Sequence, residues 1–204
     1  MVTKTSTSGS FKGTLTYCLK ESKDAEIVLS EGIRTDKLNH MVSDFVSQTD
    51  LNKRITKTVF HASISFSQED LPRLTKEGEK EILNKYLETL GEKKGIDFNN
   101  TQFLIVRHND KDHPHYHLVA NVVDNDGKRL KLDHIGLKMK DISKQITKEF
   151  KLTPAVDKEL QQAVKEAGYD IKKALKNQIE VEKNGRKEEL QPKKKHERDS
   201  GLSF

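Results

Sequence analysis

A cluster of histidines between two apolar runs constrains this chain more than any other part of its sequence. Residues 103–106 and 118–123 are rich in residues that favour β-strands. The ten residues at 108–117 hold four of the eight histidines of the chain. This pattern predicts a β-hairpin that carries histidines where one strand ends and the next begins.

Three of these histidines are expected to converge on one point. His108 ends the first predicted strand and His115 begins the second, so in an antiparallel pair their Cβ atoms face each other at about 5 Å. His117 is two residues beyond His115 and therefore points to the same face of the sheet. Three imidazoles placed in this way are suitable ligands for a divalent metal ion. Solvated histidines at a sheet edge are the alternative, and they would explain one such residue better than three.

Other polar residues are candidates for supporting this site. We expect His113 to be an alternative ligand or a neighbour of the ligands. Asp110 and Asp112 can fix imidazole tautomers by hydrogen bonding, although aspartates are also common turn formers. Asp110 is the candidate for assisting proton transfer or orienting a ligand. His61 either supports the site or is an ordinary hydrogen-bonded histidine.

Apolar periodicity elsewhere predicts an alternation of strands and helices. Short strands are expected at residues 1–5, 25–29, 57–66 and 128–132, and helices at residues 11–20, 36–48, 76–94 and 138–150. The predicted fold is an α/β sandwich with a central, mainly antiparallel β-sheet and helices packed on one face. The hairpin of residues 103–123 should lie at its centre, with helices 36–48 and 76–94 over the apolar face.

The first predicted helix carries a tyrosine in an unusual position. Ser10 is a suitable N-cap, and the apolar residues that follow share one face of the helix. Tyr17 lies off that apolar stripe, on the face that includes Gly13 and Lys20. A tyrosine held in this way is a candidate nucleophile, and an ordinary half-buried tyrosine is the alternative.

Composition restricts the class of protein. Hydrophobic residues make up 33% of the chain and charged residues 34%, which predicts a folded protein with a very polar surface. The net charge of +5 favours a polyanionic partner. The single cysteine excludes internal disulfides and suits a reducing compartment. No apolar run approaches the roughly 18 residues of a membrane span, so we expect a cytoplasmic protein.

Three stretches of the sequence resemble one family. The motif from His108 to Asn121, His-x-Asp-x-x-His-Pro-His-Tyr-His-Leu-Val-Ala-Asn, resembles the metal motif of conjugative relaxases, the mobilization nucleases of the His-hydrophobic-His endonuclease superfamily. Residues 1–19 resemble the family's opening strand, glycine-containing turn and tyrosine-bearing helix. Residues 59–66 resemble the strand that precedes the metal hairpin. The resemblance covers roughly residues 1–155 and implies a supporting role for Asn121.

The resemblance implies a specific reaction. Tyr17 would attack a phosphodiester of single-stranded DNA at an origin of transfer, leaving a 5′-phosphotyrosine and a free 3′-hydroxyl. Among the other tyrosines, Tyr86 belongs to a predicted core stripe, Tyr116 alternates to the face opposite the metal ligands, and Tyr169 lies outside the matched region. The family generally uses Mg²⁺ or Mn²⁺, whereas three nitrogen ligands suit Mn²⁺, Zn²⁺ or Ni²⁺. Expected partners are auxiliary proteins of the nicking complex and a coupling protein.

Two other functions are compatible with these patterns. A rolling-circle replication initiator shares the metal motif and the tyrosine chemistry, but the tyrosine precedes the metal hairpin here, as in relaxases. A non-catalytic, metal-stabilised protein that binds single-stranded DNA would form no covalent adduct.

The predicted domain organisation is a relaxase domain at residues 1–155, a helical extension at 156–181 and a basic, flexible tail at 182–204. Phosphate contacts are expected from two groups of residues, unless their lysines only form solvated surfaces. These are Lys12, Gly13 and Lys20 near the tyrosine, and Lys138, Lys140, Lys144 and Lys148 on the last predicted helix.

Overall fold

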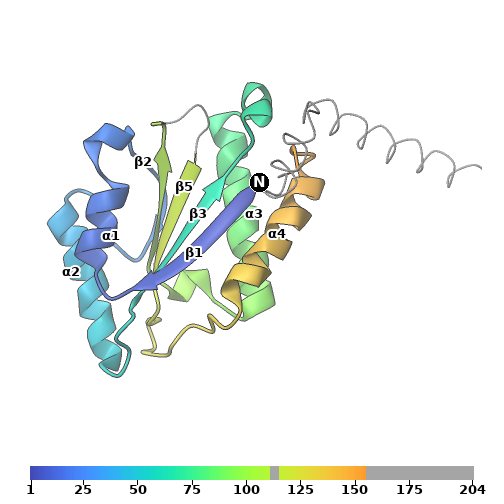
Figure 1. Cartoon of the computed structure of the whole chain (residues 1–204). Coiled ribbons are helices and arrows are strands. Elements are labelled where there is room, and N and C mark those ends of the chain that lie inside the picture. The colour runs from blue at the N-terminus through green and yellow to red at the C-terminus, as the bar shows by residue number, and fades with distance from the viewer. Residues whose placement is uncertain (111–114, 155–204) are drawn as a thin grey trace, which may run out of the picture. The chain divides into compact units, whose positions relative to one another are not determined.

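The computed structural model describes residues 1–110 and 115–154, which contain a five-stranded sheet and four α-helices (Figure 1). The strands are β1 (Val2–Ser8), β2 (Glu26–Glu31), β3 (Val59–Ser65), β4 (Phe103–His108) and β5 (His115–Asn121). The helices are α1 (Phe11–Cys18), α2 (Leu38–Thr49), α3 (Lys76–Lys94) and α4 (Ile135–Glu149). The predicted extension at 156–181 and tail at 182–204 lie outside the described residues.

The sheet is antiparallel throughout and has the strand order β1-β3-β5-β4-β2. The predicted hairpin therefore supplies β5 at the centre and β4 beside it, which confirms its position in the sheet. Every residue of β5 is buried. None of the helices in the described part of the chain is long and apolar enough to span a membrane.

The predicted α/β sandwich around an antiparallel sheet is confirmed, but helices cover both faces of the sheet instead of one. Figure 1 shows α1 and α2 on one side and α3 and α4 on the other. The central strands are apolar on both faces, as is usual for strands buried on both sides. Side chains on the α1/α2 face include Val59, Leu104, Val106 and Val119. Those on the α3/α4 face include Phe60, Ala62, Ile64, Ile105, Leu118 and Ala120.

Local capping explains where α1 and α3 begin and where α3 ends. The Ser10 side chain accepts a hydrogen bond from the Gly13 amide at the start of α1, as predicted for an N-cap. Thr75 makes the same contact with the Gly78 amide at the start of α3. Gly95 ends α3 with φ of 63°, a left-handed conformation that glycine adopts without strain.

The predicted strand at residues 128–132 is absent from the described structure. Only one isolated bridge, between Val123 and Arg129, forms there. The Asp124 carboxylate accepts hydrogen bonds from the amides of Asp126 and Lys128, at 3.0 and 2.8 Å. Residues 124–128 thus form a turn, and after it the chain leads into α4 instead of extending the sheet.

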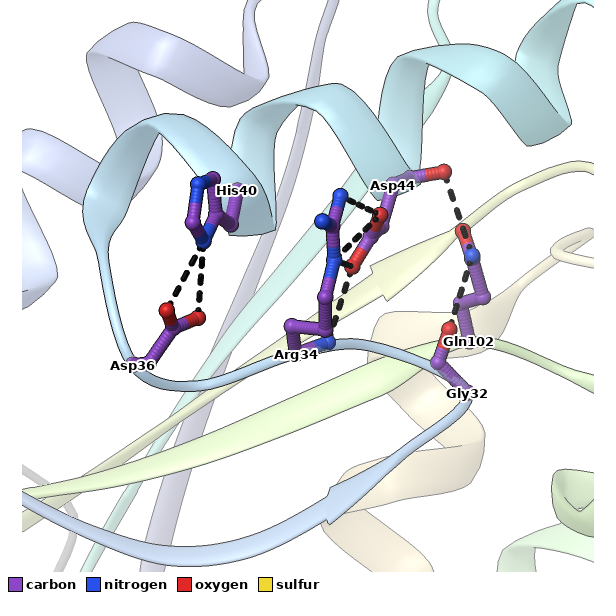
Figure 2. A network of polar contacts seen from close by, with 6 residues as sticks. All are labelled: Gly32, Arg34, Asp36, His40, Asp44 and Gln102. Carbon is purple, nitrogen blue, oxygen red and sulfur yellow. Dashed lines mark hydrogen bonds and ion pairs between the residues drawn. The ribbon is translucent and has the colours of Figure 1, made fainter.

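A polar network ties α2 to the end of the sheet opposite the histidines. Gln102 Nε2 donates to the carbonyl oxygens of Gly32 and Asp44 at 3.0 and 3.1 Å (Figure 2). Asn121 Nδ2 donates to the carbonyl of Phe45 at 3.0 Å and to Gln102 Oε1 at 3.2 Å. The buried amides of this network are thereby satisfied, which fixes α2 on the sheet.

Candidate functional site

Three histidines of β4 and β5 converge on the α1/α2 face of the sheet. His108 and His115 are register partners, and His117 lies two residues further along β5. The ring centroids of His108 and His117 are 4.3 Å apart, and those of His108 and His115 are 5.0 Å apart. All three rings are buried, and one ligand atom from each lies within 4.8 Å of the others.

Hydrogen bonds from outside the cluster set which nitrogen faces inward. His108 Nε2 lies 2.6 Å from the Cys18 carbonyl oxygen and therefore donates its proton there, which leaves Nδ1 as the acceptor. His117 Nδ1 lies 2.9 Å from His61 Nε2, which leaves Nε2 of His117 facing the cluster. Asp110 Oδ1 lies 3.7 Å from His115 Nε2.

The cluster fits a divalent metal ion. His108 Nδ1 and His117 Nε2 are buried and have no hydrogen-bond partner among the described residues. A buried polar atom of this kind costs about 1–3 kcal/mol of stability when nothing binds it. Three converging imidazole nitrogens, two of them without any other partner, form a donor set that a divalent cation satisfies.

His61 of β3 supports this arrangement from the side. Besides its bond to His117, its Nδ1 lies 3.5 Å from Ser6 Oγ. Burial lowers the pKa of His61, and the neighbouring His108 lowers it further. Burial, followed by the neighbouring His108, His61 and His115, also lowers the pKa of His117 to about 3. Both rings are therefore neutral near pH 7, the form that binds metal.

Cys18, His61 and His117 form a second group whose ligand atoms lie within 4.8 Å of one another. Its two nitrogens, however, are already hydrogen-bonded to each other. Burial also raises the pKa of the Cys18 thiol to about 12, so the thiol stays protonated. We interpret this group as support for His117.

Tyr17 lies directly over the histidines. Its helix is anchored by the buried side chains of Phe11, Leu15 and Cys18, while Tyr17 itself is 48% exposed. The Tyr17 ring centroid is 5.5 Å from that of His117 and 6.1 Å from that of His108. The structure thus brings together an accessible phenol and the predicted metal ligands, although 90 residues separate them in the sequence.

The other tyrosines lie elsewhere. Tyr86 is fully buried and donates a hydrogen bond to the Met139 carbonyl at 2.8 Å, which confirms that it is a core residue. Tyr116 is buried on the α3/α4 face, as predicted, with its hydroxyl 3.3 Å from Arg107 Nε. Burial raises the pKa of both phenols. Tyr169 lies outside the described residues.

Asp110 joins the site through a lysine that the sequence patterns did not reveal. Lys23 Nζ lies 2.5 Å from Asp110 Oδ2 and 5.7 Å from the centroid of the Tyr17 ring. The hydrogen bond from Lys23 is the main cause that lowers the pKa of Asp110. A carboxylate paired in this way is a weak base, so the structure favours an orienting role for Asp110 over proton transfer.

Comparison with known proteins agrees with this geometry. A family model described as relaxase, MobA/VirD2-like, nuclease domain matches residues 17–152. The chain belongs to this relaxase family. The match begins at Tyr17 and includes all the histidines of the site. No curated protein and no solved structure matched the chain.

Membership confirms the family indicated by the three sequence motifs. It identifies the chain as a DNA-nicking nuclease domain, a class that acts on single-stranded DNA and typically uses a divalent metal ion. It also favours a relaxase over the rolling-circle initiator considered from the sequence.

One predicted residue of the relaxase site, Asn121, is not brought to the histidines. The side-chain amide of Asn121 bonds instead to Phe45, Gln102 and the Val123 backbone, so it makes no contact with the histidines in this structure. Asn121 is four residues along β5 from His117, a distance of about 13 Å in a strand. His113 and Asp112 lie outside the described residues.

The predicted DNA-contacting residues of the relaxase divide between the two faces of the sheet. Lys12, Gly13 and Lys20 are exposed on or just after α1, on the side of the site. A Cβ atom at Gly13 would lie 3.3 Å from Ser10 Oγ, so a larger residue there would press on the oxygen that caps α1. Lys138, Lys140, Lys144 and Lys148 belong to α4, which packs on the opposite face and is not part of this site.

Proposed function

We propose that this relaxase nicks one strand of DNA at an origin of transfer by transesterification, with Tyr17 as the nucleophile. The observation that carries the proposal is the position of an exposed phenol over three converging histidines. His108, His115 and His117 are the proposed ligands of a divalent metal ion. The other described tyrosines, Tyr86 and Tyr116, are buried.

The proposed reaction exchanges one phosphoester for another. Tyr17 Oη attacks the scissile phosphorus, the Oη–P bond forms, and the bond from phosphorus to the 3′-oxygen breaks. The 5′-phosphate stays on the tyrosine, the phenol loses its proton, and the leaving 3′-oxygen gains one. No water is consumed, so a 3′-hydroxyl can reverse the step. This suits strand transfer during mobilization of a plasmid or another mobile element.

The surrounding residues orient the proposed metal ligands. The Cys18 carbonyl fixes the tautomer of His108, the hydrogen bond with His61 orients the His117 ring, and Asp110 lies beside His115. When bound, the metal ion supplies positive charge that polarises a phosphate oxygen. Mn²⁺ or Mg²⁺ is the proposed ion, and Zn²⁺ or Ni²⁺ is the alternative that three nitrogen ligands allow.

We also propose the cellular setting that this activity requires. Residues 1–155 carry the reaction, the protein acts in the cytoplasm, and auxiliary nicking-complex proteins and a coupling protein deliver or receive the DNA. The positive net charge is consistent with a polyanionic partner.

A covalent adduct tests the proposal directly. The protein is incubated with Mn²⁺ and a pool of single-stranded oligonucleotides carrying origin-like sequences, and a denaturing gel separates protein that has gained DNA. We expect a shifted band that yields the reacting oligonucleotide on digestion of the protein. A protein that binds the pool tightly but never forms the adduct would instead be a non-catalytic DNA-binding protein.

A further inference from the structure

We infer that Lys23 is a further catalytic residue of this relaxase, whose ammonium group contacts the scissile phosphate beside Tyr17 while Asp110 holds it in place before DNA binds. The inference rests on the proposed Tyr17 chemistry and identifies the group that neutralises the reacting phosphate from the protein side.

The backbone around Lys23 is fixed to the histidine hairpin. Lys23 is the last residue of a 3₁₀ turn, η1 (Glu21–Lys23), that follows α1. The Asn109 amide donates to the Lys23 carbonyl at 3.1 Å, and Asn109 Nδ2 donates to the Asp24 carbonyl at 3.0 Å. Asn109 directly follows the metal-ligand candidate His108. The lysine is therefore attached to the same strand end as the proposed ligands.

Its side chain lies close to the proposed nucleophile and to the carboxylate beside His115. Lys23 Nζ is 2.5 Å from Asp110 Oδ2 and 5.7 Å from the Tyr17 ring centroid, and its side chain is 23% exposed. The hydrogen bond with Asp110 raises the pKa of Lys23, so the ammonium stays charged at neutral pH. Within the described part of the chain, this is the one cation in contact with the Tyr17 ring.

The charge of the reacting group explains why a cation is needed there. A phosphodiester carries one negative charge, and attack by a phenolate brings a second into the transition state. A fixed cation at the place where charge develops stabilises the transition state more than the bound substrate. Partly exposed lysine–aspartate pairs are weak and the lysine stem is flexible, so Nζ can exchange Asp110 for a phosphate oxygen.

Single-turnover adduct formation by the full chain tests this role, using the oligonucleotide recovered with the unaltered protein. Lys23→Met should slow the step by about 100-fold, as for loss of one donor to a developing charge. Lys23→Arg keeps the charge and should recover most of the rate. Lys80→Met, which removes an exposed lysine of α3 on the other face, is the matched control and should react at the unaltered rate.

The variant Asp110→Asn distinguishes between two roles of Lys23, a catalytic role and one that only positions the Asp110 carboxylate. This variant breaks the pair but keeps the ammonium group, so it should lose less rate than Lys23→Met. If Lys23 acted only by holding Asp110 near His115, the two variants would lose the same rate and Mn²⁺ affinity would fall with it. Mn²⁺ affinity measured by calorimetry should instead be unchanged in Lys23→Met.

A neutral substrate gives the sharpest readout. With a methylphosphonate at the scissile position, the charge of the bound phosphodiester is absent and only the charge brought by the nucleophile develops, so the rate difference between Lys23→Met and unaltered protein should become clearly smaller. A full deficit on this substrate, or equal rates on the normal one, would overturn the inference while the adduct of the unaltered protein still supports the proposed function. Failure of the unaltered protein to form any adduct would overturn both.

Discussion

The same strands build both faces of the sheet, but their side chains form mainly apolar core on one face and the candidate site on the other. On the α3/α4 face, β5 contributes Tyr116, Leu118 and Ala120 to a continuous apolar core. On the α1/α2 face it contributes Val119 to a smaller core, and then His117 and His115 to the site. Because alternate residues of one strand point to opposite faces, neighbouring positions serve stability and chemistry separately. Substitutions along β5 should therefore affect either property with little effect on the other.

The largest expected effect is on the chemistry of the α1/α2 face. Tyr17→Phe removes one hydroxyl group and almost no volume, so the covalent DNA adduct should disappear while the melting temperature and the affinity for DNA persist. Added metal should not restore it, since metal cannot replace a nucleophile. A gel that still shows an adduct would move the assignment to another tyrosine, with Tyr169 tested next.

The next effect is on metal binding. His117→Ala removes a proposed ligand and should lower Mn²⁺ affinity by more than the 10–100-fold typical of losing an outer partner. His61→Ala, which removes only the support of His117, should stay within that 10–100-fold range. Titration calorimetry measures both. Adduct formation by these variants should recover in part at high Mn²⁺, because weaker binding is offset by mass action.

A matched substitution on the α3/α4 face should lower the stability of the protein and leave its metal affinity unchanged. Leu118 is fully buried beside His117, and Leu118→Ala should lower the free energy of unfolding by about 2–5 kcal/mol. The Mn²⁺ affinity of the folded protein should be unchanged. Denaturant unfolding monitored with and without metal tests this, and a large loss of metal affinity in Leu118→Ala would show that the faces are coupled.

A smaller effect concerns pH in the metal-free protein. The pKa of His117 is lowered to about 3 in the fold, whereas an unfolded histidine has a pKa of about 6.5. The stability contributed by neutral His117 is therefore present above about pH 6.5 and is lost as the pH falls toward 3, because the unfolded state binds the proton first. Between pH 6.5 and 5 the unfolding free energy should decline, and His117→Ala should decline less.

Local spacing explains which parts of this molecule were predictable. The convergence of His108, His115 and His117 follows from two neighbouring strands and a two-residue interval, so the sequence was sufficient for it. The position of Tyr17 over these rings depends on the packing of α1 and was indicated only by the family resemblance. The predicted packing of helices on one face was wrong because Val59, Leu104 and Val106 form a second apolar face, which α1 and α2 cover.

Two polar residues make contacts that the sequence patterns did not predict. Lys23 lies in a 3₁₀ turn without periodicity, and its partner Asp110 is 87 positions away in the chain. Asn121 belongs to the family motif, but its amide holds α2 and the β4 end instead of the site. In both cases the partner is set by tertiary contacts that no local spacing encodes.

The hydrogen bond from His108 to the Cys18 carbonyl has a mechanical consequence. Cys18 directly follows Tyr17 and ends α1, so the helix that carries the proposed nucleophile also holds a proposed metal ligand through a backbone carbonyl. Inserting or deleting a single residue in α1 before Tyr17 would turn its ring by about 100° about the helix axis and displace this carbonyl as well. The positions of the Tyr17 phenol and of the His108 ring therefore depend on the same helix, so α1 can vary in composition on its outer surface but not in length before Tyr17.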